Sequence, residues 1–242
     1  MIIISRCPYR VSLLGGSSDL DWYVNDSGEG IALGFAIKLY SRVIIALRES
    51  HQKGILNYSS REEYKDINSI SHPIIRSCFK RFNIQKKLEL ISIGEAFSGT
   101  GLGSSSSFTV ALIKALSELN NISKTNTDIA HLASEIEIKD LKKKIGRQDQ
   151  YLCSLGGSNI LKFQPNGKVT SLNNSKIKES ISDFSKNLYL IDTKITRNAT
   201  KKLSDIEKQT NSKILINDLF KIANTFIEKS YNLNRFEIQD FL

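Results

Sequence analysis

The chain of 242 residues is poor in cysteine, and it has only three prolines, three histidines and one tryptophan. Cys7, Cys78 and Cys153 lie far apart without C-x-x-C spacing, which argues against a disulfide framework or zinc ribbon and is typical of a reducing cytoplasm. No apolar run approaches the roughly 18 residues of a membrane span, and the apolar start at residues 1–6 is too short for a signal peptide. We therefore expect a cytoplasmic protein without a membrane partner.

Acidic residues are fewer than basic residues, 25 against 34, so the formal net charge is +9. A basic surface attracts nucleic acid and phosphorylated small molecules alike. The basic residues are scattered, however, and no aromatic residues interleave with their densest run, Lys142–Lys144, as a nucleic-acid platform would require. We expect no nucleic-acid partner, although an RNA-binding domain remains an alternative. The histidines share no metal-ligand spacing, and we interpret them as structural or surface residues: His51, His72 and His131.

Short apolar runs rich in Ile and Val alternate with helical patterns along the chain, and we see no internal repeat. The runs predict strands, and they cover residues 2–4, 11–14, 31–37, 42–47, 88–93 and 158–163. Apolar residues at three- and four-residue steps predict a helix of about four turns from near Ser105, a second over 129–136 with Thr127 or Asp128 as N-cap, and a third over 215–226. This order predicts a mixed α+β protein. The turn signal at 164–167 marks a soft domain boundary.

The strongest signal is the segment Ser98-Gly-Thr-Gly-Leu-Gly-Ser-Ser-Ser-Ser107. Glycines at alternate positions let the backbone approach a bulky anion, and the following helix directs its free N–H groups and positive dipole end toward the loop. The serines add hydroxyls for phosphate or a divalent cation. A flexible linker is disfavoured because an amphipathic helix follows at once. Neither a Walker A lysine nor the third glycine of a dinucleotide fingerprint is present.

Three motifs resemble one family. Gly101-Leu-Gly-Ser-Ser-Ser-Ser107 resembles the second motif of the GHMP kinases, and Arg6-Cys-Pro-Tyr-Arg-Val-Ser-Leu-Leu-Gly-Gly-Ser-Ser-Asp19 is similar to the opening of the branch acting on D-glycero-D-manno-heptose 7-phosphate. Ile145-Gly-Arg-Gln-Asp-Gln-Tyr151, followed by Gly156-Gly157, resembles a third segment of that branch. The resemblance spans residues 1 to about 165, and it continues more loosely through Ile191-Asp-Thr and Thr196-Arg197.

The resemblance implies a GHMP-kinase-like two-domain fold. Residues 1–165 would form the N-terminal, ribosomal-protein-like ATP-binding domain, and residues 166–242 part of the C-terminal α+β domain. Since the family's glycine-rich third motif and closing strands do not occur before Leu242, we expect the C-terminal domain to be incomplete. The implied function is ATP- and Mg²⁺-dependent phosphorylation of a sugar hydroxyl, at the anomeric position of a heptose 7-phosphate. The implied partner is a sugar or sugar phosphate, and the oligomeric state is left open.

The resemblance also assigns roles to residues. The catalytic residues are Asp149 as the carboxylate that takes up the hydroxyl proton and Arg10 as a fixed positive charge beside it. The metal ligands are Ser105 and Glu137. Those assigned to ATP are Gly99, Gly101, Leu102, Gly103, Ser104, Ser105 and Ser106. Those assigned to the sugar are Gly15, Gly16, Ser18 and Asp19.

Other interpretations of these residues stay open. Asp149 is also suited to cap a helix, Arg10 to cover apolar surface, Asp19 to form a turn without a ligand and Glu137 to be a solvated surface charge. Glu135 should face away from Glu137 and pair with Lys139 four residues on. Gln148 and Gln150 are interpreted as scaffolding, with substrate contact by Gln148 left open. For the whole chain, a kinase for fucose or a hexose and a non-catalytic binding module remain alternatives.

Overall fold

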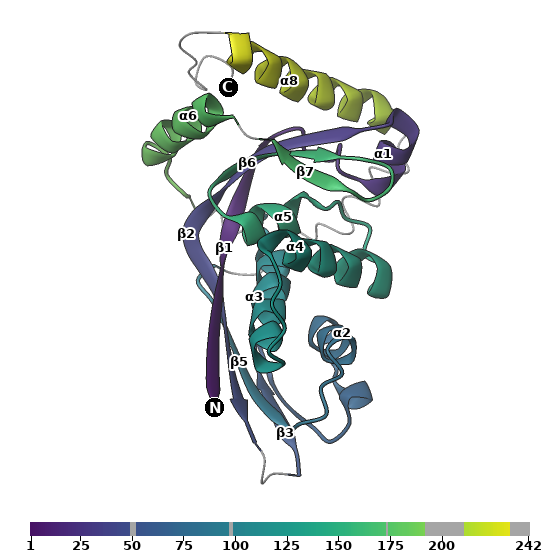
Figure 1. Ribbon diagram of the computed structural model, residues 1–242, viewed down its shortest axis with the longest axis vertical. Coiled ribbons are helices and arrows are strands. Elements are labelled where there is room, and N and C mark those ends of the chain that lie inside the picture. Colours follow the sequence, from purple (N-terminus) through teal and green to yellow (C-terminus); the bar gives the residue numbers. More distant parts are fainter. Residues whose placement is uncertain (49–51, 97–98, 173, 192–210, 233–242) are drawn as a thin grey trace.

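The computed structural model describes residues 1–48, 52–96, 99–172, 174–191 and 211–232. It contains a seven-stranded, mainly antiparallel sheet with helices on its faces (Figure 1). The predicted α+β class is therefore confirmed. These ranges exclude Ser98, Asp192, Thr193, Thr196 and Arg197 of the motifs above. They also exclude His51, which is interpreted above as a structural or surface residue.

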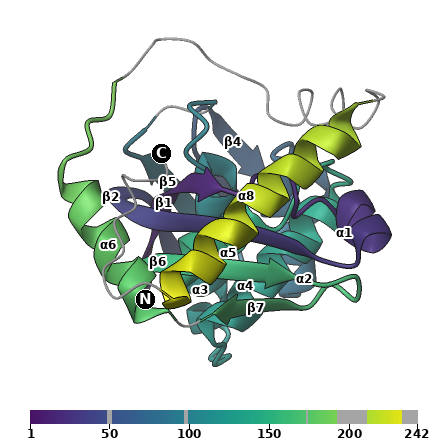
Figure 2. The ribbon, with the colours of Figure 1, turned by 90° about the horizontal axis from the view of Figure 1, so that it is seen from above.

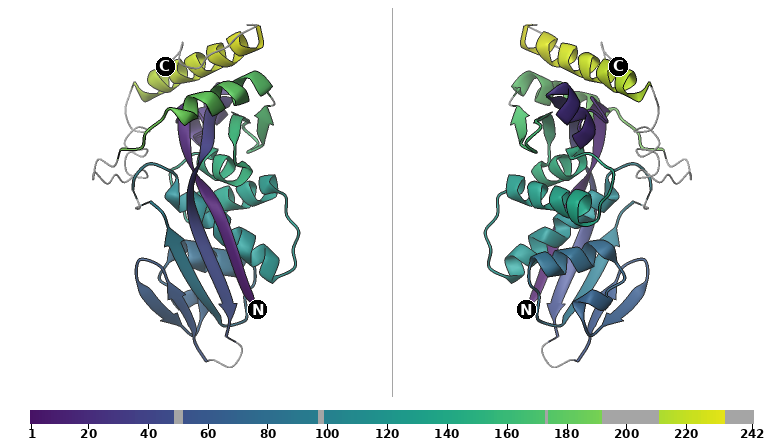
Figure 3. Two further views of the ribbon diagram at one scale, coloured as in Figure 1. Left: turned by 90° about the vertical axis from the view of Figure 1, so that its left-hand side faces the viewer. Right: turned by 90° about the vertical axis from the view of Figure 1, so that its right-hand side faces the viewer.

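The long strand β2 (Gly30–Leu47) organises the sheet. From Leu33 to Ala46 it pairs antiparallel with β1 (Ile2–Leu14), and Figure 3, left, looks onto this pair with the helices α3–α5 behind it. On its other edge, β2 pairs first with β6 (Ser158–Phe163) and farther along with β5 (Leu88–Gly94). The four predicted runs 2–4, 11–14, 31–37 and 42–47 thus belong to two continuous strands. The register shift between Pro8 and Tyr9 lets β1 continue past its proline.

Three further strands escaped the sequence patterns because each has only four residues. They are β3 (Gly54–Asn57), β4 (Arg61–Tyr64) and β7 (Val169–Leu172). With them the strand order across the sheet is β4-β3-β5-β2-β6-β7, and β1 pairs with β2 outside this order. The predicted turn at 164–167 joins β6 to β7, where Gly167 N–H donates to Gln164 O at 2.9 Å. The predicted domain boundary at residue 165 lies in this turn and stays a prediction.

One face of the sheet carries the main core. Here α2 (Pro73–Arg81), α3 (Ser104–Leu119) and α4 (Asn126–Glu135) bury their apolar residues against β2, β3 and β5. The helix α3 begins where the pattern predicted. The predicted N-cap of α4 is wrong: the cap is Thr125, which forms a capping box with Asp128, because a Thr before Asn-Thr-Asp lets both side chains satisfy backbone N–H groups.

The other face carries α6 (Ser175–Lys186) and α8 (Ser212–Asn232), with α8 lying across the end of the sheet (Figure 2). Alternation along β2 explains this division. Ile31 and Leu33 pack against α6 and α8, whereas Ala32 packs against α5 (Gln148–Leu155) on the opposite face. Among the described helices, none is long and apolar enough to cross a bilayer. Three short elements complete the fold: α1 (Asp21–Ser27), η1 (Ile67–Ser69) and the π-helix η2 (Ile136–Asp140).

Candidate active site

The glycine loop leads directly into α3. Gly103 is the N-cap of this helix and has φ +73°, in the left-handed region that favours glycine. Because Gly103 has no side chain, no capping hydroxyl or carboxylate competes for the amide N–H groups of the first turn. Ser105 is exposed there, whereas Ser106 is buried. The start of α3 therefore offers backbone N–H groups, a positive dipole end and one accessible hydroxyl to an anion.

Arg10 connects this loop to α5. Its guanidinium donates from Nε and Nη2 to the two carboxylate oxygens of Asp149, at 2.7 and 2.6 Å, and from Nη1 to Gly101 O at 2.5 Å. The backbone N–H of Arg10 donates to Leu102 O at 3.1 Å. Burial lowers the pKa of Arg10, but the adjacent Asp149 carboxylate outweighs it and the pKa is raised. The alternative that Arg10 only covers apolar surface is therefore wrong.

Asp149 lies in the first turn of α5, and 28% of its side chain is exposed. The alternative role as a helix cap does not apply, because Arg147 is the N-cap position and no side chain caps it. The Asp149 carboxylate instead faces Arg10 and stays partly open to solvent. It is therefore a fixed, accessible carboxylate next to the glycine–serine loop.

Glu137 is fully buried in η2, so the alternative of a solvated surface charge is wrong. Its Oε2 accepts from Ser106 Oγ at 2.8 Å and from Gln150 Nε2 at 2.7 Å. Its Oε1 accepts from Ser105 Oγ at 2.7 Å and from Lys143 Nζ at 2.7 Å. Glu135 turns away and pairs with Lys139, as predicted.

Sequence reasoning missed the role of Lys143. Its position in the run Lys142–Lys144 suggested a solvated basic face, yet its ammonium group lies between Glu137 and Ser105. The spacing of six residues from Glu137 is not a helical one, so only the irregular segment after η2 brings the two together. Gln150, interpreted as scaffolding, is buried beside Glu137, and its own Oε1 has no hydrogen-bond partner among the described residues.

A second carboxylate, Asp19, is held by the same α5 terminus. Its Oδ2 accepts from the backbone N–H of Gln148 at 2.8 Å, and its Oδ1 accepts from Gln148 Nε2 at 3.2 Å. Gly146 leaves room for it, because a Cβ there would lie 1.9 Å from Asp19 Oδ2. Burial raises the pKa of Asp19 to about 6, and the nearby charge of Asp149 adds to this, while the Gln148 N–H lowers it.

The turn before Asp19 is a scaffold for it. Gly15 has φ +74°, and a Cβ there would lie 2.0 Å from Ile31 O. Ser18 is fully buried, with its hydroxyl 2.7 Å from Gly15 O and 2.6 Å from Ile31 O, and the same oxygen accepts from Ile31 N–H. The Ser18 hydroxyl is thus hydrogen-bonded to backbone groups. Gly16, in the same turn, is half-buried. The assignment of these turn residues to substrate stays a prediction.

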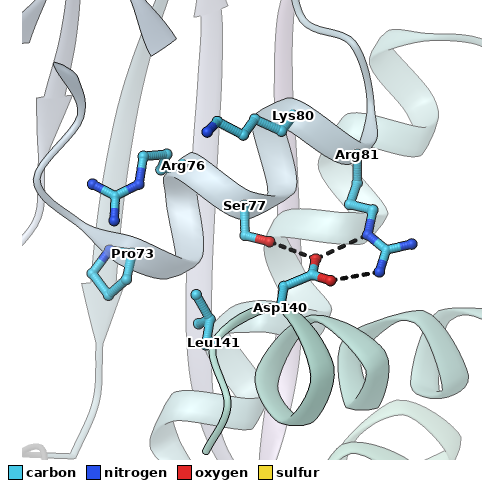
Figure 4. A pocket seen from close by; sticks show the side chains of 7 residues that line it. All are labelled: Pro73, Arg76, Ser77, Lys80, Arg81, Asp140 and Leu141. Atoms are coloured by element: carbon cyan, nitrogen blue, oxygen red, sulfur yellow. Dashed lines mark hydrogen bonds and ion pairs between the residues drawn. The ribbon is translucent and has the colours of Figure 1, made fainter. Parts of the chain in front are cut away.

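An ion pair outside the site fixes η2 against α2 (Figure 4). Asp140 accepts from Ser77 Oγ at 2.7 Å and from Arg81 Nε and Nη2 at 2.9 and 2.6 Å. These Arg81 hydrogen bonds hold the pKa of Asp140 below its ordinary value. The residues border a shallow hollow of about 350 Å³, lined by Pro73, Arg76, Ser77, Lys80, Arg81, Asp140 and Leu141. This contact joins the end of η2 to α2 and lies outside the hydrogen bonds that hold the Glu137 carboxylate.

The donor set suits a hard divalent cation. Ser105 Oγ and Glu137 Oε1 are oxygen ligands of the kind that Mg²⁺ prefers, and Lys143 already brings a positive charge to both. No group of three His, Cys, Asp or Glu side chains that could hold a metal occurs in the part of the chain that the structure describes. A cation here would therefore need further oxygens from a ligand, as phosphates provide.

The comparisons with known proteins agree with this fold and motif set. Residues 69–157 match the family model described as "GHMP kinases N terminal domain". The resemblance to the GHMP kinases is therefore confirmed, and the chain has their fold.

A more particular similarity is to D-glycero-alpha-D-manno-heptose 7-phosphate kinase of Campylobacter jejuni, 32% identical over 226 residues. That alignment covers 88% of this chain and 64% of the relative, so the chain spans less than two thirds of the relative's length.

Two solved structures show the same fold. A D-glycero-D-manno-heptose 1-phosphate kinase from Bacteroides thetaiotaomicron aligns with a TM-score of 0.65 and 24% identity over 76% of this chain and 72% of its own. Mevalonate kinase from Methanococcus jannaschii aligns with a TM-score of 0.67 and 21% identity over 97% of this chain and 73% of its own.

Proposed function

We propose that this chain is a kinase that transfers the γ-phosphoryl group of ATP to a hydroxyl of a sugar phosphate, with Mg²⁺ as cofactor. One observation carries the proposal. Arg10 bonds Asp149 through two nitrogens and the carbonyl of Gly101 through the third. It thereby holds a carboxylate at a fixed position relative to a glycine loop at a helix N-terminus, which is the arrangement that phosphoryl transfer requires.

The roles of the residues follow from their positions. The first-turn N–H groups of α3 and the Ser104–Ser106 segment bind the phosphates. Asp149 accepts the proton of the attacking hydroxyl while the new O–P bond forms and the bond to the ADP leaving group breaks. The guanidinium of Arg10 orients Asp149 and stabilises the negative charge of the transferred group. Ser105 and Glu137 would hold Mg²⁺, which neutralises phosphate charge when bound.

For the acceptor, we propose the anomeric hydroxyl of a heptose 7-phosphate. The proposal draws on the similarity to a heptose 7-phosphate kinase and on the net charge of +9, which favours an anionic substrate. Asp19 and Gln148 would bind the sugar hydroxyls next to the reacting one. Asp19 Oδ2 lies 2.8 Å from the backbone N of Gln148, and Asp149 is near enough to affect the pKa of Asp19. A kinase for another sugar is the alternative within the same reaction class.

The test is a panel of acceptors with ATP and Mg²⁺, read by ADP release and by ³¹P NMR. The panel contains D-glycero-D-manno-heptose 7-phosphate, mannose 6-phosphate, fucose, galactose and mevalonate, and a reaction without acceptor gives the background. We expect turnover with the heptose phosphate and a new phosphorus signal coupled to the anomeric proton. Turnover restricted to another acceptor would overturn the substrate assignment. Tight ATP binding without turnover of any acceptor would overturn the enzymatic assignment and favour a binding module.

A further inference from the structure

Lys143 contacts both of the side chains proposed to hold the metal, Glu137 and Ser105. Its Nζ lies 2.7 Å from Glu137 Oε1 and 2.9 Å from Ser105 Oγ. The side chain of Glu137 is fully buried, so its carboxylate has no contact with solvent. In contrast, 24% of the Lys143 side chain is exposed. A buried carboxylate without a counter-charge is strongly unfavourable. Lys143 therefore supplies the counter-charge of the buried Glu137 carboxylate.

The two oxygens of Glu137 have different partners. Oε2 accepts from the buried side chains Ser106 and Gln150, which fix the carboxylate in place. Oε1 accepts from the exposed Ser105 and from the partly exposed Lys143 side chain. Only the Oε1 side can therefore exchange one cation for another without disturbing the packing around Glu137.

We infer that Lys143 is the built-in competitor of the divalent cation at Glu137 and Ser105. The inference rests on the proposed function for the identity of the metal ligands. Mg²⁺ binds oxygen at about 2.0–2.1 Å, so an ammonium group in contact with the same two oxygens excludes it sterically and by charge. Lysine is suited to this exchange because its point charge sits on a flexible four-carbon stem.

The competition has a consequence for the order of events. Without nucleotide, the ammonium group has Glu137 as its anionic partner, and a divalent cation must displace it. Phosphates bound at the start of α3 would offer Lys143 another anion close to Ser105. The divalent cation and the nucleotide should then bind cooperatively, each raising the affinity for the other by the same factor. The site would thus take up metal together with nucleotide rather than alone.

The experiment measures Mn²⁺ binding to the full chain by electron paramagnetic resonance, with and without a non-hydrolysable ATP analogue. Lys143→Gln removes the charge but keeps a hydrogen-bond donor for Glu137. Without the analogue, this variant should bind Mn²⁺ at least about fivefold more tightly than the wild type. With the analogue, the two proteins should differ less. Its melting temperature without metal should fall below that of the wild type and recover on addition of Mn²⁺.

Three further variants test the mechanism. Lys143→Arg keeps the charge and should bind Mn²⁺ as weakly as the wild type. Lys142→Gln removes a neighbouring charge whose side chain is exposed, and it should change neither binding nor melting. Glu137→Gln combined with Lys143→Gln should abolish the gain in Mn²⁺ affinity.

The outcomes separate this inference from the proposed function. If Lys143→Gln binds Mn²⁺ no more tightly than the wild type, or if Lys142→Gln gains as much, the inference is overturned while the kinase proposal stands. If neither the wild type nor Lys143→Gln binds Mn²⁺ even with the analogue, the metal assignment of Ser105 and Glu137 falls and takes the inference with it. Sugar phosphorylation is measured separately and does not enter either readout.

Discussion

Arg10 and Asp149 are 139 residues apart in the sequence, and their side chains form two parallel hydrogen bonds of 2.7 and 2.6 Å. Arg10 belongs to β1, and Asp149 lies in the first turn of α5. The same guanidinium reaches the carbonyl of Gly101, so a single side chain fixes three segments relative to one another. A planar, five-donor group can do this, whereas a point charge cannot.

Arg10→Lys tests that geometric role. The ammonium group keeps the positive charge but cannot bond both Asp149 oxygens and the Gly101 carbonyl together. We expect the turnover number for sugar phosphorylation to fall by about 10²–10³, the usual cost of losing an oriented donor at a reacting group. Arg81→Lys is the matched control, because Arg81 makes a similar double contact to Asp140 outside the site. Equal losses in the two variants would contradict a specific role for Arg10.

Asp149→Asn removes the proposed proton acceptor while keeping the size of the side chain. The turnover number should drop by about 10²–10⁴, the usual contribution of general base catalysis. The dissociation constant for ATP, measured by calorimetry, should change little, because the proposed phosphate site is formed by the loop and α3 and not by Asp149. Asp140→Asn also removes a carboxylate paired to an arginine and should keep wild-type turnover. Full activity in Asp149→Asn would remove this residue from the mechanism.

Local patterns predicted the elements that carry the site, but not the contacts between them. The start of α3 and the strands β5 and β6 follow from apolar periodicity and from the glycine–serine segment. The four-residue strands β3, β4 and β7 are too short to show a period. The motif resemblance supplied Arg10 and Asp149 separately, and only the fold of β1 against α5 makes them an ion pair.

The position of Lys143 next to Glu137 could not be predicted from the sequence. A charge run is usually a solvated face, and its neighbours Lys142 and Lys144 are exposed. The chain turns through a left-handed residue at Lys142, with φ 53°, and this directs the next side chain to Glu137. No residue pattern marks such a turn at a lysine. The contact between Lys143 and Glu137 is therefore visible only in the folded structure.

Glu137→Gln tests the metal site through the Mg²⁺ dependence of the rate. A neutral amide oxygen is a weaker ligand than a carboxylate, and Lys143 would remain nearby without its counter-charge. The Mg²⁺ concentration for half-maximal rate at fixed ATP should rise by about tenfold or more. Removal of a residue that only supports a metal ligand already lowers metal affinity by about that factor. Glu135→Gln, two positions earlier and paired at the surface with Lys139, should leave it unchanged. Identical Mg²⁺ curves for all three proteins would refute the assignment of Glu137.

Gly103→Ala and Gly101→Ala separate backbone strain from contact with Arg10. Both glycines have left-handed φ values, +73° and +80°, so each alanine should cost about 1 kcal/mol of unfolding free energy. A Cβ on Gly103 would lie 3.2 Å from Arg10 Cγ, whereas one on Gly101 would meet nothing within 4 Å. At saturating ATP, only Gly103→Ala should lower the turnover number, by displacing Arg10. A larger loss of turnover in Gly101→Ala than in Gly103→Ala would show that the contact between position 103 and Arg10 is unimportant.

Asp19 should make stability depend on pH in an unusual direction. Its pKa is about 6 in the folded chain against an ordinary value of 3.8, so the folded state retains the proton longer than the unfolded state. The stabilisation is complete below pH 3.8 and is lost as the pH rises through about 6. The shift corresponds to about 3 kcal/mol. In urea unfolding from pH 4 to 8, Asp19→Asn should lack this decline, because asparagine resembles the protonated acid. Asp21→Asn, which removes the partner of Arg147, should keep the wild-type slope. If wild type and Asp19→Asn lose stability in parallel over this range, Asp19 is ionised in the folded chain throughout.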